Sequence, residues 1–277
     1  MNKCSIVNKL RIRASELNVS FNDVLSQFFY DEFLKLLSMS QYNENFLLKG
    51  GMLVAYKIGL QNRSTRNIDF LINGLDFNIE NMRNIISDIV SMHTNEVWYE
   101  LIGNWELIRL DDIYGGARFH LIGHVSNIRL PFTLDIATGD PIYPIPKKEK
   151  YRTLLGDCIY LYFYSLESVV AEKLQTILAR AENNTRMKDF YDIYIIFNNN
   201  GLELESLKLA IRYTFSYRHT SISKKNALDI RKLICENPVF EERWIRFQNK
   251  NTYVKNITFD NICDCLNELI LIYFEIK

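Results

Sequence analysis

Short apolar runs of β type, interrupted by one amphipathic helix, fill the chain between Phe46 and Pro146, and this alternation constrains the fold most. The expected strands are Phe46–Leu48, Ile68–Ile72, Trp105–Leu110, Ala117–Gly123 and Phe132–Ile136. A helical pattern precedes them up to about Leu37, and another lies between the second and third strands, from Ile79 to Met92. Strands mixed with helices predict an α/β sheet domain.

The remainder of the chain is helical in pattern. Prolines at 141, 144 and 146 mark the exit from the strand-rich part. The expected helices are Leu166–Ala181, Lys188–Asn198, Leu204–Phe215, Lys224–Glu236 and Ile262–Glu275. The sequence therefore predicts an α/β (α+β) domain with N-terminal helices over residues 1–150 and a mainly α-helical domain over residues 151–277.

Composition indicates an ordinary cytoplasmic globular protein. Of the 277 residues, 48% are hydrophobic and 24% charged, and the formal net charge is zero. The N-terminus has no signal-peptide pattern, and no apolar run approaches the roughly 20 residues of a membrane span. The five cysteines are scattered, without the spacing of a metal or redox pair, so we expect free and mostly buried thiols in a reducing compartment.

A pair of glycines follows the first expected strand. Gly50 and Gly51 stand between the apolar run Phe46–Leu48 and a helical run. Glycines at such a turn let a phosphate approach the backbone, where the free N–H groups of a helix N-terminus attract it. A plain strand-to-helix turn has the same sequence, so the pair alone does not decide between the two.

Three oxygen-bearing side chains then lie on expected strands. Residues two apart on a strand point to the same side, so Asn67 and Asp69 project together. Asp135 lies within another apolar strand and supplies a third. Carboxylates beside a glycine turn suit Mg²⁺, which binds a few carboxylates together with triphosphate oxygens. An isolated strand aspartate is more often an edge or turn residue, but three elements in this order favour a metal site.

The order of these motifs resembles the AbiEii/AbiGii-type nucleotidyl transferase toxin family, within the polymerase-β-like nucleotidyltransferases. The matching elements are Gly50–Gly51, the segment Arg63–Ile72 with its Arg-x-Thr-x-Asn-x-Asp pattern, and the Leu-Asp-Ile strand around Asp135. Downstream, residues 165–174 contain Lys173, and residues 186–193 contain a Lys-Asp-x-x-Asp motif. Together the matches span residues 46–197.

The resemblance implies a role for each matching residue. Asp69 and Asp135, with Asn67 at the third ligand position, would hold Mg²⁺. Lys173 would contact the triphosphate, and Asp189 would be catalytic or position the nucleotide. The implied nucleotide-binding set is Gly50, Gly51, Arg63, Ser64, Lys173 and Asp192. Without the resemblance, Asp189 and Asp192 would be interpreted as solvated or as paired with Lys188 and Arg186.

One departure from the family concerns the metal site. The family has Asp where this chain has Asn67, and an amide offers a carbonyl oxygen without a charge. Losing a unit charge some 4 Å from a divalent ion is worth several kcal/mol at an effective dielectric constant of about 20. Weaker metal binding or slower transfer is expected. A natural variant, an inactivating change and a degenerate family member all remain open.

Basic residues are concentrated in the C-terminal helices. Between Ser206 and Lys255 there are eleven Lys and Arg against four acids, a balance of +7 in a chain that is neutral overall. The candidates for RNA binding are Lys224, Lys225, Arg231 and Lys232. Aromatic residues interleave with the basic ones and could stack on bases. The alternative is a solvated helical face with its aromatics in the core.

The sequence leaves three functions open. The first is a Mg²⁺-dependent toxin of a toxin–antitoxin or abortive-infection phage-defence pair, which transfers nucleotides from an NTP to RNA, with the tRNA 3′ end the leading acceptor; it implies a separately encoded antitoxin. The second is a member of the fold that has lost metal chemistry at Asn67 and binds a nucleotide or a partner. The third is an enzyme that nucleotidylates small molecules.

Overall fold

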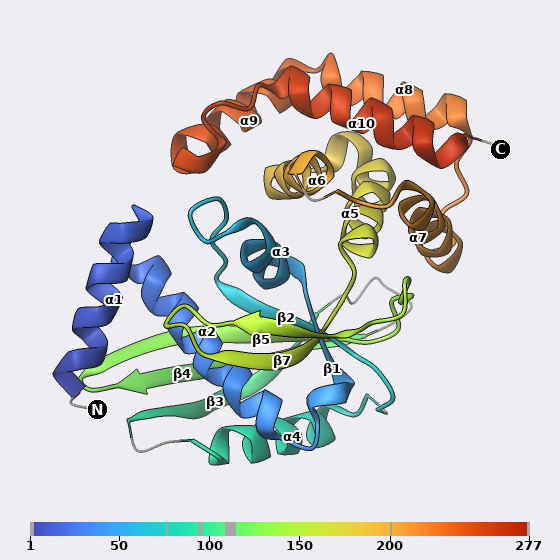
Figure 1. Cartoon of the computed structure of the whole chain (residues 1–277). Helices are drawn as coiled ribbons and strands as arrows, with labels where there is room; N and C mark the ends of the chain where they lie inside the picture. The colour runs from blue at the N-terminus through green and yellow to red at the C-terminus, as the bar shows by residue number, and fades with distance from the viewer. Residues whose placement is uncertain (1–2, 76, 94–95, 109–114, 200, 276–277) are drawn as a thin grey trace. The chain divides into compact units, whose positions relative to one another are not determined.

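A seven-stranded mixed sheet forms the centre of the first part of the chain in the computed structural model, which describes residues 3–75, 77–93, 96–108, 115–199 and 201–275. The order across the sheet is β3-β4-β5-β2-β1-β7-β6. Figure 1 labels all of these strands except β6. The strands are β1 Phe46–Lys49, β2 Asn67–Ile72, β3 Val97–Ile108, β4 Gly116–Val125, β5 Ile128–Ala137, β6 Lys148–Arg152 and β7 Cys158–Phe163. The predicted mixed α/β fold is confirmed.

All five expected strands are present, and two further strands were not predicted. Trp105–Ile108 of the expected strand Trp105–Leu110 is the end of the longer β3, and Arg109 and Leu110 lie outside the described residues. The sequence pattern did not predict β6, because it is a polar edge strand in which four of five side chains are exposed. β7 pairs with β6 antiparallel and with β1 parallel, so this hairpin completes the sheet.

The chain separates into two units at a different place from the expected one. The first unit comprises Met1–Asp140 and Pro146–Tyr164, and the second comprises Pro141–Ile145 and Ser165–Lys277. Residue 150, the expected boundary, lies inside β6, whose pairing keeps it in the first unit. The short segment 141–145 belongs to the second unit, where the Ser165 hydroxyl donates to the carbonyl oxygen of Tyr143 at 2.7 Å.

Among its described residues, the first unit has four α-helices: α1 Lys3–Leu17, α2 Phe21–Met39, α3 Gly50–Ile58 and α4 Ile79–Ser91. The apolar face of α2 packs on the sheet through aromatic rings. Phe33 lies 6.3 Å from Phe70 and 6.0 Å from Tyr99, measured between ring centroids. A side chain at Gly123 would meet the ring of Phe29 at 2.4 Å, so α2 lies directly against β4. This packing anchors β2, β3 and β4.

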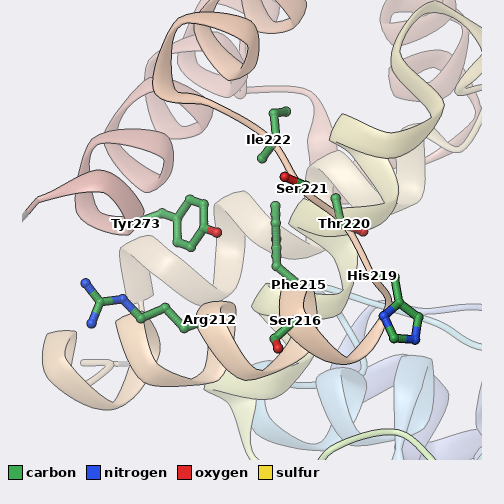
Figure 2. A pocket seen from close by; sticks show the side chains of 8 residues that line it. All are labelled: Arg212, Phe215, Ser216, His219, Thr220, Ser221, Ile222 and Tyr273. Carbon is green, nitrogen blue, oxygen red and sulfur yellow. The ribbon is translucent and has the colours of Figure 1, made fainter.

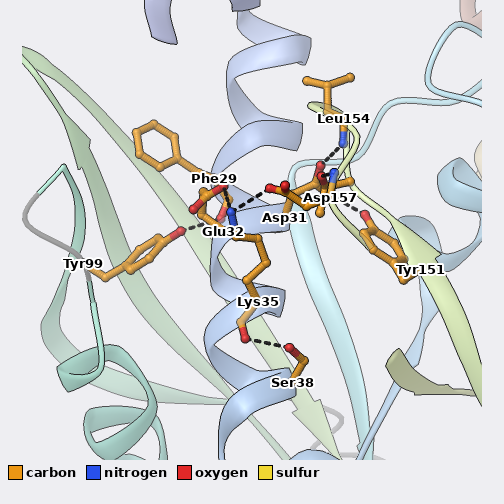
Figure 3. Close-up of polar contacts among 10 residues, drawn as sticks. Phe29, Asp31, Glu32, Lys35, Ser38, Tyr99, Tyr151, Leu154 and Asp157 are labelled. Atoms are coloured by element: carbon orange, nitrogen blue, oxygen red, sulfur yellow. Dashed lines mark hydrogen bonds and ion pairs between the residues drawn. The ribbon is translucent and has the colours of Figure 1, made fainter. Parts of the chain in front are cut away.

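Polar contacts tie α2 to strands on both sides (Figure 3). The carboxylate of Asp31 accepts hydrogen bonds from the Tyr151 hydroxyl, from Gln27 Nε2 at 2.8 Å and from the backbone N–H of Leu154. The Tyr99 hydroxyl, on β3, donates to the carbonyl oxygen of Phe29 at 2.7 Å. Asp31 therefore joins α2 to the β6–β7 hairpin from a buried position.

Burial raises the pKa of Asp31 to about 7, and its three hydrogen bonds only partly offset the cost of desolvation. A folded-state pKa above the unfolded value means that the folded protein binds the extra proton between pH 4 and 7. We therefore expect Asp31 to stabilise the fold below pH 4 and to lose this contribution as the pH rises to 7. The change is on the order of a few kcal/mol, at about 1.4 kcal/mol per pKa unit.

Denaturant unfolding of the parent and of Asp31→Asn at several pH values measures this effect. The stability of the parent relative to Asp31→Asn should decrease between pH 4 and pH 7.5. Because an amide at this position disturbs the hydrogen bonds at every pH, the slope of that difference is the readout and not its absolute value. Parallel stability curves for the two proteins would contradict the assignment.

The second unit is helical. Its helices are α5 Leu166–Arg180, α6 Met187–Asn199, α7 Leu204–Tyr217, α8 Lys224–Cys235, α9 Pro238–Lys250 and α10 Phe259–Phe274. The sequence interpretation did not predict α9. This helix begins at Pro238, and the side chain of Asn237 caps its N-terminus. Among the described residues, none of the helices combines the length and apolar character that crossing a bilayer requires.

The expectation of free thiols is wrong for one pair of cysteines. Cys235 at the end of α8 and Cys263 on α10 form a disulfide, with their Cα atoms 5.9 Å apart. The two residues are 28 apart in sequence, and only the packing of α8 on α10 brings them together. Cys158 is a free, exposed thiol and Cys265 a free, buried one, and burial raises the pKa of Cys265 to about 12.

Candidate active site

Asp69 and Asp135 lie side by side at the centre of the sheet. β2 and β5 are parallel, and their register pairs the Cα atom of Asp69 with that of Asp135. Cross-strand partners point to the same face, so both carboxylates project together from neighbouring strands. Asp135 is 9% exposed, and the flanking Ile68, Phe70, Leu134 and Ile136 point into the core. The structure thus brings these two expected metal ligands together.

The amide group of Asn67 bridges the two carboxylates. Its Nδ2 donates to Asp69 Oδ1 at 2.8 Å and to Asp135 Oδ2 at 3.0 Å. The Thr65 hydroxyl lies 3.2 Å from Asn67 Oδ1 and 3.2 Å from the Asn67 carbonyl oxygen. Asn67 therefore occupies the expected third position, with its hydrogen-bond donor, and not its oxygen, directed at the aspartates.

Arg118 completes this cluster and was not predicted. On β4, directly opposite Asp135, it donates from Nε to Asp135 Oδ1 and from an Nη atom to Oδ2, both at 2.7 Å. Hydrogen bonding to Asp135 raises the pKa of the Arg118 guanidinium. The pair is a bidentate one, which holds a carboxylate in a fixed orientation. The available sequence signal was weak, because Arg118 shares the expected strand Ala117–Gly123 with another polar residue, His120.

Gly50 makes room for Asp69, and Gly51 hydrogen-bonds it. Gly50 has φ +60°, and a Cβ atom there would lie 2.2 Å from Asp69 Oδ2. The backbone N–H of Gly51 donates to the same oxygen at 3.1 Å. A side chain at Gly50 is therefore excluded by both the backbone angle and the close approach of the carboxylate. The N–H expected to face a phosphate is engaged by Asp69.

Arg63 and Ser64 lie in the loop before β2. Arg63 is 4% exposed, and its guanidinium donates to the carbonyl oxygen of Ser64. A Cβ atom at Gly51 would lie 2.9 Å from Arg63 Nη2 and 2.8 Å from Thr65 Oγ1, so the loop packs closely against the glycine turn. These contacts position the loop. A contact of Arg63 or Ser64 with nucleotide stays a prediction.

A buried ion pair lies beside the cluster. Lys49, at the end of β1, is the cross-strand partner of Asp69, and its Nζ lies 2.7 Å from Asp140 Oδ2. Both side chains are almost completely buried, and the Lys49 ammonium lies 4.7 Å from the ring centre of Tyr164. The sequence interpretation named neither Lys49 nor Asp140, which are 91 residues apart.

The second unit holds a separate charged cluster built from the downstream motifs. Lys173 on α5 forms ion pairs with Asp189 and with Asp192 on α6, the latter at 2.9 Å. Asp189 and Asp192 share a helix face, as three-residue spacing requires. The Asp192 side chain is fully buried, whereas those of Lys173 and Asp189 are 16% exposed. The structure thus brings together all three residues that the downstream motifs indicated.

The structure divides the basic residues of the second unit into two groups. Among the four RNA-binding candidates, Lys224 and Lys225 are exposed, Arg231 lies 4.0 Å from Asp264, and Lys232 lies 4.0 Å from Glu236. Two of the aromatic residues that interleave with the basic ones, Phe215 and Trp244, are core residues, each 1% exposed. The solvated-face interpretation therefore applies to part of this segment.

The donor set at Asp69 and Asp135 is compatible with Mg²⁺ delivered with a triphosphate. Within the described ranges, no group of three or more His, Cys, Asp or Glu side chains could hold a metal by itself. Mg²⁺ in nucleotide sites commonly takes one or two carboxylates plus phosphate oxygens and waters. The two aspartates meet that minimum, and Asn67 could add a carbonyl oxygen after its amide rotates.

A mixed sheet with paired strand aspartates behind a Gly-Gly turn, followed by a helical unit, places the chain among proteins of the nucleotidyltransferase fold. More specifically, residues 32–264 match the family of nucleotidyl transferase AbiEii toxins of type IV toxin–antitoxin systems, and the chain belongs to this family. The expected family is confirmed.

Two solved structures from Helicobacter pylori share the fold. One, a protein assigned as a nucleotidyltransferase, is 12% identical with a TM-score of 0.53, and the match covers 92% of this chain and 96% of that one. The other, JHP933, is 14% identical with a TM-score of 0.54, over 92% and 93% of the two chains. At such identities the likeness is one of fold. No curated protein matches the sequence.

Proposed function

We propose that this chain is a toxin that transfers nucleotides from Mg²⁺-bound NTP to RNA, with the tRNA 3′ end as the leading acceptor. Membership of the toxin family supports the general class of activity. The family also implies a cognate antitoxin, encoded separately. The observation that carries the proposal is the pairing of Asp69 with Asp135 on adjacent strands beside the Gly50–Gly51 turn.

In this proposal, the residues of the cluster around Asp69 in the first unit have separate roles. Asp69 and Asp135 would hold Mg²⁺, which when bound offsets triphosphate charge and stabilises the leaving pyrophosphate. Arg118 keeps Asp135 in one orientation through its two hydrogen bonds. Asn67 rotates its amide so that Oδ1 replaces Nδ2 between the carboxylates. In the second unit, we assign triphosphate contacts to Lys173 and nucleotide positioning to Asp189 and Asp192.

The hydrogen bonds of Asn67 favour a second candidate function. With Asn67 neutral, Asp69, Asp135 and Arg118 give the cluster a net charge of −1, where an aspartate at position 67 would give −2, and the Asn67 amide already donates to both carboxylates. Such a site can be stable without a metal. A family member that binds nucleotide or antitoxin without transfer would have this arrangement.

Incubation with each labelled NTP, Mg²⁺ and total RNA separates the two functions. The first predicts label on RNA that depends on Mg²⁺, with tRNA as the labelled species. Protein that binds NTP but labels no RNA, in parent and Asn67→Asp forms alike, would support the second. Toxicity on expression without antitoxin is the matching test in cells.

Asn67→Asp should shift metal binding and stability in opposite directions. A third carboxylate restores a charge near the ion, so the affinity for Mg²⁺-NTP should rise tenfold or more. Without metal, the substitution removes two hydrogen-bond donations and adds a like charge beside two aspartates. We therefore expect the free energy of unfolding to fall by about 2 kcal/mol in the absence of Mg²⁺.

Calorimetric titration with a non-hydrolysable NTP and Mg²⁺, with thermal melting in EDTA, measures both effects. Asn67→Ala is the control, because it loses the amide without adding a charge. It should lower the free energy of unfolding without raising the affinity for Mg²⁺-NTP. If the aspartate form has the parent's affinity and the parent's melting temperature, Asn67 lies outside the metal site.

A further inference from the structure

The second unit has a hollow of about 540 Å³ between the end of α7, the loop after it and the end of α10 (Figure 2). Phe215 and Tyr273 form an aromatic wall, with ring centroids 4.8 Å apart. Phe215 is 1% exposed, so Tyr273 offers the accessible ring. The lining residues are Arg212, Phe215, Ser216, His219, Thr220, Ser221, Ile222 and Tyr273.

The polar groups of this hollow are mostly uncommitted. The Thr220 hydroxyl accepts from Gln175 Nε2 at 2.8 Å and donates to the Arg218 carbonyl oxygen. Within the described ranges, the side chains of Arg212, Ser216, His219 and Ser221 and the hydroxyl of Tyr273 make no hydrogen bond or ion pair. None of the described lining residues is acidic. A guanidinium beside several hydroxyls and an imidazole is a set of donors suited to a phosphate.

The surroundings of the hollow extend the positive charge. Its loop leads through Ser223 into the first turn of α8, where Lys224 and Lys225 are exposed and unpaired among the described residues. By contrast, Arg218 is held by Glu172 at 3.6 Å and by Gln175 at 3.0 Å. Other basic residues of the segment are also engaged: Arg231 with Asp264, Lys232 with Glu236, Arg243 with the Asn184 carbonyl oxygen, and Arg246 with Glu242. Lys250 and Lys255 are also exposed and unpaired among the described residues, but Arg212 lines the hollow, and Lys224 and Lys225 directly follow its loop.

We propose that this hollow binds one nucleotide of single-stranded RNA, an inference that rests on the proposed RNA acceptor. A base stacks on the Tyr273 ring, and Arg212 with the hydroxyls of Ser216 and Ser221 binds its phosphate. Lys224 and Lys225 contact phosphates farther along the strand. Aromatic stacking beside phosphate donors is how proteins bind unpaired RNA, and the volume suits one nucleotide.

An acidic protein is the competing partner, and the shape of the site argues against it. Carboxylates of a protein surface would pair with Lys224 and Lys225 where these are exposed, and would not require a concave site with an aromatic wall. A base and its phosphate use both parts of the hollow together. The single-strand requirement follows because a paired base presents its edge to its partner and its faces to the stack.

Fluorescence anisotropy with a labelled ten-nucleotide single-stranded RNA and the full chain tests the proposal. Arg212→Glu should weaken binding tenfold or more and flatten the salt dependence, because it reverses the charge at one phosphate. Tyr273→Leu should weaken binding about fivefold or more through lost stacking. Arg246→Glu is the matched control, with the same charge reversal on an exposed residue of α9 away from the hollow, and should change affinity less than threefold.

Four outcomes would overturn the site. These are equal losses in Arg212→Glu and Arg246→Glu, unchanged RNA binding in both hollow variants, competition by a mononucleotide as effective as that by the RNA, and loss of antitoxin binding in place of RNA binding.

Transfer assays on the same proteins separate this proposal from the proposed function. RNA binding that is lost in Arg212→Glu, in a parent that transfers nothing, supports the hollow and refutes the transferase.

Discussion

Asp69→Asn should abolish nucleotide transfer while leaving the protein folded. The substitution removes one of two carboxylates from a cluster whose net charge is already only −1, so the remaining site should not hold Mg²⁺-NTP in a reactive arrangement. Losing a metal ligand that contributes several kcal/mol to the transition state corresponds to a reduction in rate of at least about 10³-fold. The asparagine oxygen can still accept one of the two hydrogen bonds from Gly51 and Asn67. The stability cost should therefore stay at about 1–2 kcal/mol.

Glu106→Gln provides the matched control for this measurement. Glu106 lies on β3 opposite Arg118, so it belongs to the same cross-strand row, but its side chain is 58% exposed and contacts His120. It should retain transfer within about threefold, since an exposed pair of this kind contributes little. Transfer by Asp69→Asn above a tenth of the parent rate, with folding intact by circular dichroism, would refute the metal role of Asp69.

Period-two patterning found the core of this site because it depends on single strands. Asn67 and Asp69 share a face by spacing alone, and Asp135 stands out in an apolar strand. Arg118 and the Lys49–Asp140 pair depend on which strands become neighbours and in what register. That information comes from packing across the sheet and not from local sequence. The contribution of these three residues to the site is therefore evident only in the folded chain.

The C-terminal half shows the same limit for charge. The sequence predicts a net positive segment, but not which cations are neutralised. Arg231, Lys232 and Arg246 lie near acids one helix or one turn away, while Arg212, Lys224 and Lys225 remain unpaired within the described residues. Similarly, the Cys235–Cys263 disulfide requires α8 and α10 to be adjacent, which helical periodicity does not reveal.

Lys173→Met should relieve toxicity and destabilise the second unit at the same time. Asp192 is fully buried, and it forms an ion pair with Lys173 at 2.9 Å. Removing the cation leaves a buried carboxylate without this partner, a change that typically costs 3–5 kcal/mol. Methionine keeps most of the lysine's length, so the loss is one of charge more than of packing. A growth defect that disappears in this variant could therefore reflect unfolding as well as lost triphosphate binding.

The double substitution Lys173→Met with Asp192→Asn separates these two causes. Neutralising both partners removes the uncompensated buried charge, so most of the lost stability should return, whereas the contact with the triphosphate should not. We expect the double variant to melt within a few degrees of the parent and to permit normal growth. It should still bind Mg²⁺-NTP at least tenfold more weakly than both the parent and Asp192→Asn alone, because Asp192 is itself assigned to nucleotide positioning. If the double variant regains both the growth inhibition and the nucleotide affinity of the parent, Lys173 acts only through the stability of the α5–α6 pair, and its assignment to the triphosphate is wrong.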